Sequence, residues 1–279
     1  MDHADRNLNQ INAIRLVSPK GNWNGNMNPT ETALRAPVIV GPGKVGSSLH
    51  AAFSLRGAEC LLLGRSDGLD QLGGRVVLLA VPDASIAGLA DRIGTAGGPP
   101  ALIGHTSGAT GLAALAGAGA GGSFSLHPLQ TVPDCDTDLT GCPAAIAGST
   151  PEALDTAREM ATMIGMRAFE VSESDRAVYH AAASIASNFL ITVEQTASEL
   201  LDGIEIGDSR EILEPLVRRS LDNWLEDGSG ALTGPIVRGD ETTVDIHRRA
   251  LIAKRPDLLD FYDTLADRTR SIAAGRHPA

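Results

Sequence analysis

The stretch Val38-Ile39-Val40-Gly41-Pro42-Gly43-Lys44-Val45-Gly46-Ser47-Ser48-Leu49 decides the fold. A short apolar run leads into the pattern G-x-G-x-x-G, and the residues from Leu49 to Arg56 have a helical pattern. Strand, glycine turn and helix in this order are typical of a dinucleotide-binding unit, in which the pyrophosphate lies on free N–H groups at the helix start. The alternative for so short a motif is a plain glycine turn. The flanking strand and helix favour the dinucleotide site.

Each glycine of this turn has an expected role. Gly41 lets the chain turn tightly at the strand end, Gly43 lets the backbone approach a pyrophosphate, and Gly46 lets the helix pack closely on the strand. The expected cofactor-binding turn therefore comprises Gly41, Pro42, Gly43, Lys44, Val45 and Gly46.

The composition bounds the class of protein. The chain has 279 residues, is 43% hydrophobic and carries a formal net charge of −11. This charge argues against nucleic acid and against an anionic membrane surface as partners, and no apolar run approaches the ~18 residues of a membrane helix. Cys60, Cys135 and Cys142 lack metal-ligand spacing. We therefore expect reduced thiols, no bound metal and a cytoplasmic location.

The chain divides into three parts by pattern. Residues 1–35 include an Asn/Gly-rich run without periodicity, so we expect a disordered extension there, with either Met1 or Met27 as the native start. Residues 36–172 alternate apolar strands with helices, which predicts a Rossmann-type, mostly parallel sheet with helices on both faces. Residues 173–279 show helical patterns without an evident strand, so we expect an all-helical domain for substrate binding and dimerisation.

Individual elements follow from the apolar runs and the turn residues. Strands are expected at Pro37–Val40, Glu59–Leu63, Arg75–Val81, Ala101–His105, Gly122–Leu126, Ala144–Ala147 and Met166–Val171. Helices are expected at Gly46–Arg56, Ile86–Ile93 and Pro151–Ile164, the last capped by Ser149 or Thr150, and then over 173–202, 208–226, 240–253 and 256–274.

The end of the second strand indicates which nucleotide is bound. An NAD site places an acidic residue there for the ribose 2′-hydroxyl, whereas this chain has Gly64-Arg65-Ser66. Arginine pairs with a 2′-phosphate and serine adds a hydrogen bond, so we expect NADP, as NADPH. The alternative is that Arg65 is a solvated loop residue and the preference is loose.

Four polar motifs are candidates for substrate chemistry. They are His105-Thr106-Ser107-Gly108 at a strand end, His127-Pro128-Leu129-Gln130-Thr131 in a loop, Tyr179-His180 with Ser184 and Asn188, and Leu232-Thr233-Gly234-Pro235 with Arg238-Gly239-Asp240. His180, Ser184 and Asn188 have the spacing i, i+4, i+8 and share one face of a helix. Polar residues repeating along an otherwise apolar helix need partners, and a pocket between the two domains supplies them.

Each motif also has a purely structural interpretation. Ser107 could cap a helix, His127 before a proline could fix a turn, and Asn188 could be a satisfied buried amide. Arg238 could pair with Asp240 instead of holding a substrate carboxylate.

Six of these segments together resemble one family. They are residues 41–46, Ala80-Val81-Pro82-Asp83, 125–131, 179–182, 187–189 and 232–235. From about Ala36 to about Leu265, the chain resembles Rossmann-like proteins that carry a DUF2520 C-terminal domain. The layout is similar to that of pyrroline-5-carboxylate reductases, ketopantoate reductases and 6-phosphogluconate-type dehydrogenases, which bind NADP on the first domain and substrate against a helical second domain.

The resemblance implies particular site residues. His180, Ser184 and Asn188 match the Lys, Asn and Asn of ketopantoate reductases, and Ser107-Gly108 matches their Asn-Gly. His127 is similar to a substrate-contacting histidine of prephenate dehydrogenases. This sequence differs from the ketopantoate reductases at His180, which takes the place of their usual catalytic lysine.

The expected reaction is reduction of the carbonyl or imine of a small, carboxylate-bearing metabolite in an interdomain cleft. Histidine exchanges a proton near neutral pH, so His180 would supply the proton, with Ser107, Asn188 and His127 as further catalytic residues. Ala80, Val81, Pro82 and Asp83 would border the cofactor, and Ser184, Thr233 and Arg238 would contact substrate.

Two alternatives stay open at this point. One is a ketopantoate reductase-like enzyme specifically, and the other is a non-catalytic NADP-binding sensor or scaffold. Two-domain reductases of this layout commonly pair through the helical domain, so we expect a homodimer.

Overall fold

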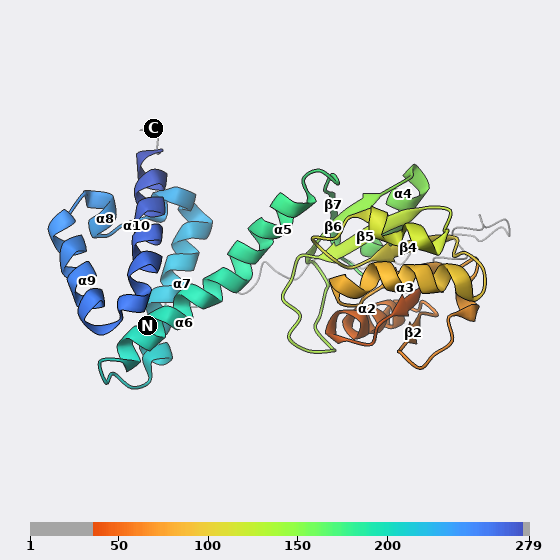
Figure 1. Ribbon diagram of the computed structural model, residues 1–279, viewed down its shortest axis with the longest axis horizontal. Helices are drawn as coiled ribbons and strands as arrows, with labels where there is room; N and C mark the ends of the chain where they lie inside the picture. The colour runs from red at the N-terminus through yellow and green to blue at the C-terminus, as the bar shows by residue number, and fades with distance from the viewer. Residues whose placement is uncertain (1–35, 276–279) are drawn as a thin grey trace, which may run out of the picture. The chain divides into compact units, whose positions relative to one another are not determined.

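The structure is a computed structural model that describes residues 36–275 (Figure 1). The expected extension at 1–35, and with it the choice between Met1 and Met27, lies outside the described residues. The chain forms two compact units, one through Ala183 and one from Ser184 onward.

The first unit is built on a seven-stranded sheet in the order β2-β1-β3-β4-β5-β6-β7. Neighbouring strands are parallel except for the antiparallel pair β5–β6. This confirms the expected mostly parallel, Rossmann-type sheet. The strands are β1 Val38–Val40, β2 Leu61–Leu63, β3 Val76–Leu79, β4 Leu102–His105, β5 Ser123–Pro128, β6 Pro143–Gly148 and β7 Arg167–Glu170.

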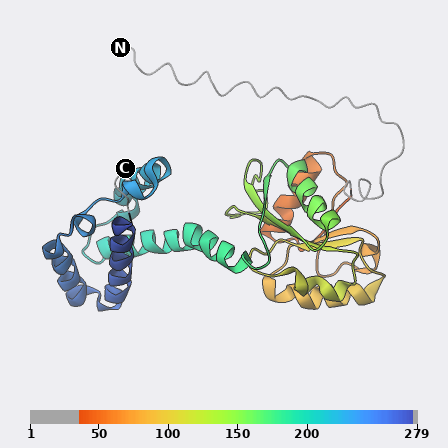
Figure 2. The same cartoon turned by 90° about the horizontal axis from the view of Figure 1, so that it is seen from above.

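Helices cover both faces of this sheet, as Figure 2 shows. On one face α2 (Lys44–Leu55) and α4 (Pro151–Met163) bury Leu49, Phe53 and Met160 against the strands. On the other face, α3 (Asp83–Ala96) and the 3₁₀ segment η2 (Leu112–Ala118) bury their own apolar side chains against the strands. The central strands β1 and β3 are apolar and buried along their whole length, as expected for parallel strands that are covered on both faces. A further 3₁₀ turn, η1, spans Asp70–Leu72.

The strand order places a switch point between β1 and β3. The chain runs from β1 outward to β2 and returns to β3 on the opposite side of β1. Ligands of open α/β sheets bind outside the carboxyl ends of the strands at such a point. The glycine turn follows β1 and the segment 80–83 follows β3, so both border this crevice.

Helices and turns make up the second unit, which has no strand among its described residues. α6 packs against α7, while α8, α9 and α10 pack together. The bounds are α6 Leu190–Asp202, α7 Ser209–Asp227, η4 Gly228–Ala231, α8 Pro235–Arg238, α9 Glu241–Lys254, η5 Pro256–Leu258 and α10 Leu259–Ala274. Within residues 36–275 no helix is both long and apolar enough to cross a membrane.

The helix expected over 173–202 is not one uniform α-helix. It begins as α5 (Arg176–Ser184), passes through the π-helical turn η3 (Ile185–Phe189) and continues as α6. His180 and Ser184 keep the expected i, i+4 spacing within α5, but Asn188 lies in the π-turn, whose i→i+5 hydrogen bonds change the spacing from Ser184 to Asn188. The shared face predicted for these three residues rested on that spacing.

Candidate active site

The glycine turn after β1 has the geometry that its sequence predicts. Gly41 adopts φ +117°, and a Cβ there would collide with the Ala80 carbonyl. A Cβ at Gly46 would collide with the carbonyl oxygen of Gly41. A Cβ at Gly43 would meet no heavy atom within 4 Å, so open space lies in front of the turn. Two glycines therefore let strand and helix approach, and the third faces the space beside them.

The start of α2 presents backbone donors to that space. Gly43 is the N-cap, no side chain caps the helix, and the first turn holds no acidic residue. The first N–H groups of an α-helix have no partner within the helix, and the helix dipole favours an anion there. This end of α2 fits a pyrophosphate.

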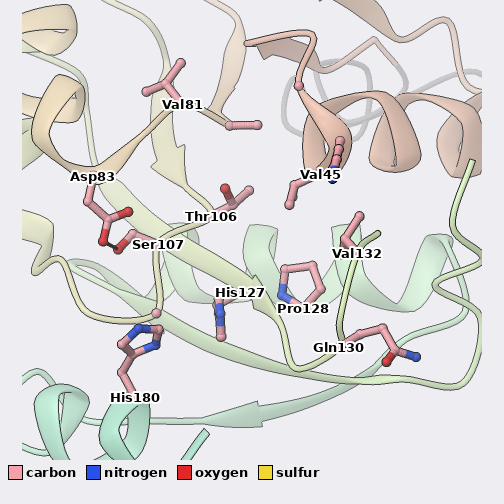
Figure 3. Close-up of a pocket in the computed structure, with 14 residues that line it drawn as sticks. Val45, Val81, Asp83, Thr106, Ser107, His127, Pro128, Gln130, Val132 and His180 are labelled. Carbon is pink, nitrogen blue, oxygen red and sulfur yellow. Dashed lines mark hydrogen bonds between the residues drawn. The ribbon is translucent and has the colours of Figure 1, made fainter. Parts of the chain in front are cut away.

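Two cavities open on either side of the turn. One has a volume of about 560 Å³ and is shown in Figure 3. The other has a volume of about 620 Å³. Both are lined by Gly43, Ala80 and Val81, so they share a wall. Two compartments that share a wall at the glycine turn have the arrangement expected for the two halves of a dinucleotide.

The larger cavity carries opposite charges at the end of β2. Gly64, Arg65, Asp67, Pro82 and Arg92 are among its lining residues. The Gly64 N–H donates to Asp67 Oδ2 at 2.7 Å, which holds this carboxylate beside the turn. Ser66 is exposed and is not one of the lining residues. Sequence reasoning missed Asp67 and Arg92, because Asp67 lies beyond the strand end and Arg92 comes from the far end of α3.

The smaller cavity brings His127 and His180 together. Their ring centroids are 5.8 Å apart in an edge-to-face arrangement, and both rings flank Gly108 (Figure 3). A Cβ at Gly108 would lie 2.5 Å from His180 Nδ1 and 2.9 Å from His127 Nε2. Lys44, Val45, Thr106 and Gln130 also line this cavity. His127 lies on β5 itself, so its expected position in a loop after the strand was wrong, because the strand continues through Pro128.

The Ser107 hydroxyl is committed to local contacts. It donates to Asp83 Oδ2 at 2.8 Å and accepts from the N–H groups of Ala109 and Thr110 at 3.2 and 2.9 Å. Since its one proton goes to Asp83, Ser107 fixes that carboxylate at the first turn of α3 and holds the loop after β4.

His127 is further bound to Tyr179. Its Nδ1 lies 2.6 Å from the Tyr179 hydroxyl. Burial, followed by the nearby His180 and Arg176, lowers the pKa of His127 to about 4. Burial raises the pKa of Tyr179 to about 12. Both side chains are therefore neutral at neutral pH, and His127 is not the proton donor.

A buried arginine anchors this end of α5. Arg176 is 2% exposed, pairs with Glu173 at 2.8 Å and donates to Ser125 Oγ at 2.7 Å. Glu173 also accepts the Leu112 N–H at 2.8 Å, on the segment that follows β4. This pair, named the Glu173–Arg176 clamp below, ties α5 to β5 and to the β4 loop. It therefore sets where Tyr179 and His180 lie.

The remaining expected site residues belong to the second unit. Ser184 ends α5, Asn188 lies in the π-turn, Thr233 precedes α8 and Arg238 ends α8, the last two being exposed. Asp240 does not pair with Arg238 by hydrogen bonding but caps α9 through Thr243. The substrate roles of these four residues stay predictions. Among residues 36–275 no three His, Cys, Asp or Glu side chains gather as they would for a metal ion.

The fold defines the class: a Rossmann-type unit followed by a helical unit. Residues 142–269 match the family model described as a domain of unknown function, DUF2520. That confirms the resemblance, although the match begins well after the glycine turn. No curated protein matches the chain.

Solved structures share the fold over most of the chain. A proposed NADP oxidoreductase from Bacteroides fragilis is 21% identical with a TM-score of 0.71, covering 85% of this chain and 99% of that one. A protein from Thermotoga maritima is 20% identical with a TM-score of 0.68, covering 85% and 98%. An imine reductase from Streptomyces aurantiacus is 15% identical with a TM-score of 0.62, covering 86% and 98%. At these identities the likeness establishes the fold.

Proposed function

We propose that this protein is an NADP-dependent oxidoreductase that reduces a carbonyl or imine of a small, carboxylate-bearing metabolite. The observation that carries the proposal is the pair of cavities that share a wall at the glycine turn. One holds two arginines, and the other holds two histidines. The neighbours named above as an oxidoreductase and an imine reductase support the same reaction class.

The residues present suit NADPH. The uncapped start of α2 would hold the pyrophosphate, and Arg65 and Arg92 would face the adenosine 2′-phosphate. Ala80, Val81 and Asp83 would border the nicotinamide ribose. When bound, NADPH would supply a hydride, which is the chemistry of the cofactor itself.

The side chains of the smaller cavity would donate the proton and the hydrogen bonds that the reaction needs. His180 would donate a proton or a hydrogen bond to the oxygen or nitrogen that gains negative charge. His127, neutral at working pH, would donate a hydrogen bond. Ser107 would position Asp83 instead of contacting substrate, since its proton is already used.

The test is a NADPH-oxidation assay at 340 nm with 2-oxo acids, ketopantoate and cyclic imines. We expect at least one substrate to be turned over, and His180→Ala to lower kcat by about 10²-fold while NADPH binding is kept. His247→Ala is the control, because His247 lies on α9, is exposed and should not matter. Absence of NADPH binding would refute the proposal. Tight binding without turnover of any substrate would favour the sensor or scaffold instead.

We also propose that the protein is a homodimer that pairs through the helical unit. The support is the number of large apolar side chains that this unit leaves more than half exposed in the single chain: Ile185, Phe189, Ile191, Ile212, Leu216, Trp224, Leu225, Ile246 and Ile252. A second copy of the chain would cover them.

A further inference from the structure

The proposed reaction does not use the contact between Tyr179 and His127. The Tyr179 hydroxyl and His127 Nδ1 are 2.6 Å apart, and the two rings pack edge to face with centroids 5.6 Å apart. Phe169 on β7 packs against the other side of the tyrosine, with centroids 5.9 Å apart. Both rings are therefore held in place by more than the hydrogen bond.

The direction of this hydrogen bond follows from the chemistry of its partners. A phenol donates more strongly than its oxygen accepts, and an unprotonated ring nitrogen of histidine is a good acceptor. Burial keeps the tyrosine protonated, since its pKa is raised to about 12. No other partner of the Tyr179 hydroxyl is present in the described part of the chain. The proton therefore lies on tyrosine and points to Nδ1.

The charged and titratable groups around His127 agree with a neutral ring. His180, Arg176 and His105 lower its pKa, and only Asp83 raises it. These groups come from α5, β4 and α3. A neutral imidazole carries one proton, and the tautomer is set by the hydrogen bond that the other nitrogen makes.

We propose that Tyr179 is a positioning residue that fixes His127 as the Nε2–H tautomer, so that His127 offers an N–H donor to an acceptor oxygen of the ligand in the smaller cavity. The edge of the ring that carries Nε2 faces Gly108, at the side where the cavity is lined by both histidines. A carbonyl or carboxylate oxygen suits this donor, and an ammonium group does not. The identity of the ligand rests on the proposed function, whereas the tautomer does not.

The experiment is nitrogen-15 NMR of the full chain labelled on histidine, with His127 assigned from a His127→Gln variant. In the wild-type protein between pH 6 and 8 we expect a protonated Nε2 and an unprotonated, hydrogen-bonded Nδ1. In Tyr179→Phe the Nδ1 signal should move toward that of a nitrogen without a donor, and the other tautomer should become measurable. A protonated Nδ1 in the wild type, or an unchanged Nδ1 signal in Tyr179→Phe, would overturn the proposal.

The chain contains a matched control. On the second unit, His247 Nδ1 and the Tyr262 hydroxyl are 2.9 Å apart with ring centroids 6.0 Å apart. Tyr262→Phe should alter the His247 signals and leave those of His127 unchanged. If Tyr179→Phe does not fold, the wild-type spectrum decides alone.

An activity measurement separates this proposal from the proposed function. The NMR result does not require turnover, so a protein without reductase activity can still show the expected tautomer. If a substrate is found, Tyr179→Phe should lower kcat roughly tenfold, which corresponds to one hydrogen bond's worth of transition-state stabilisation, with the Kd for NADPH unchanged. An unchanged kcat would contradict the role of the donor in that reaction.

Discussion

In the proposed function, nucleotide choice would depend on three side chains in one cavity. Arg65 and Arg92 would attract a 2′-phosphate, whereas Asp67, held by the Gly64 N–H, would repel it and offer an acceptor to a ribose hydroxyl. The sequence motif Gly64-Arg65-Ser66 shows only one of these. In the proposed function, the choice between NADP and NAD would therefore be a balance of two cations against one carboxylate.

Substitutions in this cavity should move the preference in opposite directions. Asp67→Asn should raise the affinity for NADPH about threefold to tenfold relative to NADH, because a repulsive charge is removed. Arg92→Gln should lower NADPH affinity about tenfold or more, with little change for NADH. Titration of both nucleotides by fluorescence measures this. Asp70→Asn, an exposed residue that does not line the cavity, is the control. Equal losses for both nucleotides in Arg92→Gln would contradict the assignment.

A buried histidine makes stability depend on pH. His105 on β4 is 0% exposed, and burial, followed by Arg176, lowers its pKa to about 4. The histidine pKa in the unfolded chain is about 6.5, so between about pH 4 and 6.5 the unfolded chain binds more protons than the folded chain. The stability contributed by this neutral histidine is therefore full above pH 6.5 and lost as the pH falls toward 4.

Urea unfolding of the first unit at pH 7, 6 and 5 should show this dependence. As the pH falls, the free energy of unfolding should decrease in both proteins. For each pH unit, the decrease should be larger in the wild type than in His105→Gln by on the order of 1 kcal/mol. His247→Gln, an exposed histidine, should keep the wild-type slope. Identical slopes in the wild type and His105→Gln would show that His105 does not carry the effect.

At the scale of elements, the sequence predicts the strands well and the irregular turns poorly. The seven strands and the glycine turn are confirmed, because continuous apolar runs and glycine positions are local signals. The antiparallel β6, the 3₁₀ segment η2, the π-turn and α8 have no such signal, since they depend on tertiary packing. The site follows the same rule. His127, Ser107 and Asp83 lie at or shortly after strand ends, whereas Arg92 lines its cavity and Tyr179 contacts His127 only through the fold.

The Glu173–Arg176 clamp should matter far more than an exposed ion pair. Glu173→Gln leaves the buried Arg176 charge without its carboxylate, and Arg176→Met leaves the Ser125 hydroxyl and Glu173 without their arginine donor, so each should lower stability by about 3 kcal/mol. Arg158→Met, which removes exposed pairs with Asp155 and Glu170, should cost no more than about 1 kcal/mol. Thermal unfolding with each purified variant measures the difference. A loss in Glu173→Gln no larger than in Arg158→Met would show that the clamp is not stabilising.

At the scale of the whole molecule, the helical unit lacks the core that the first unit has. Among its described residues only Val244, Leu251 and Ala266 are buried hydrophobic side chains. A unit with so little buried apolar surface needs a further surface to pack against. A second copy of the chain would provide that surface.

Charge on the exposed apolar helices should therefore break the dimer. Leu216→Glu and Leu225→Glu, at 65% and 74% exposure on α7, should shift the mass measured by light scattering from dimer to monomer. Leu55→Glu, at 85% exposure on α2 of the first unit, should leave the dimer intact. A monomeric wild-type protein at working concentration would contradict this prediction.

The wall that the two cavities share has a consequence for how a ligand enters and leaves. Because Gly43, Ala80 and Val81 belong to both, a ligand half bound in one cavity holds the other half within a few ångströms of its place. The second half then binds at a high effective concentration, which can raise the combined affinity by roughly 10²- to 10⁴-fold over either half alone. Adenosine 2′,5′-bisphosphate and nicotinamide mononucleotide should thus each bind weakly and without competing. An inhibitor that links one group for each cavity should therefore bind far more tightly than either group binds alone.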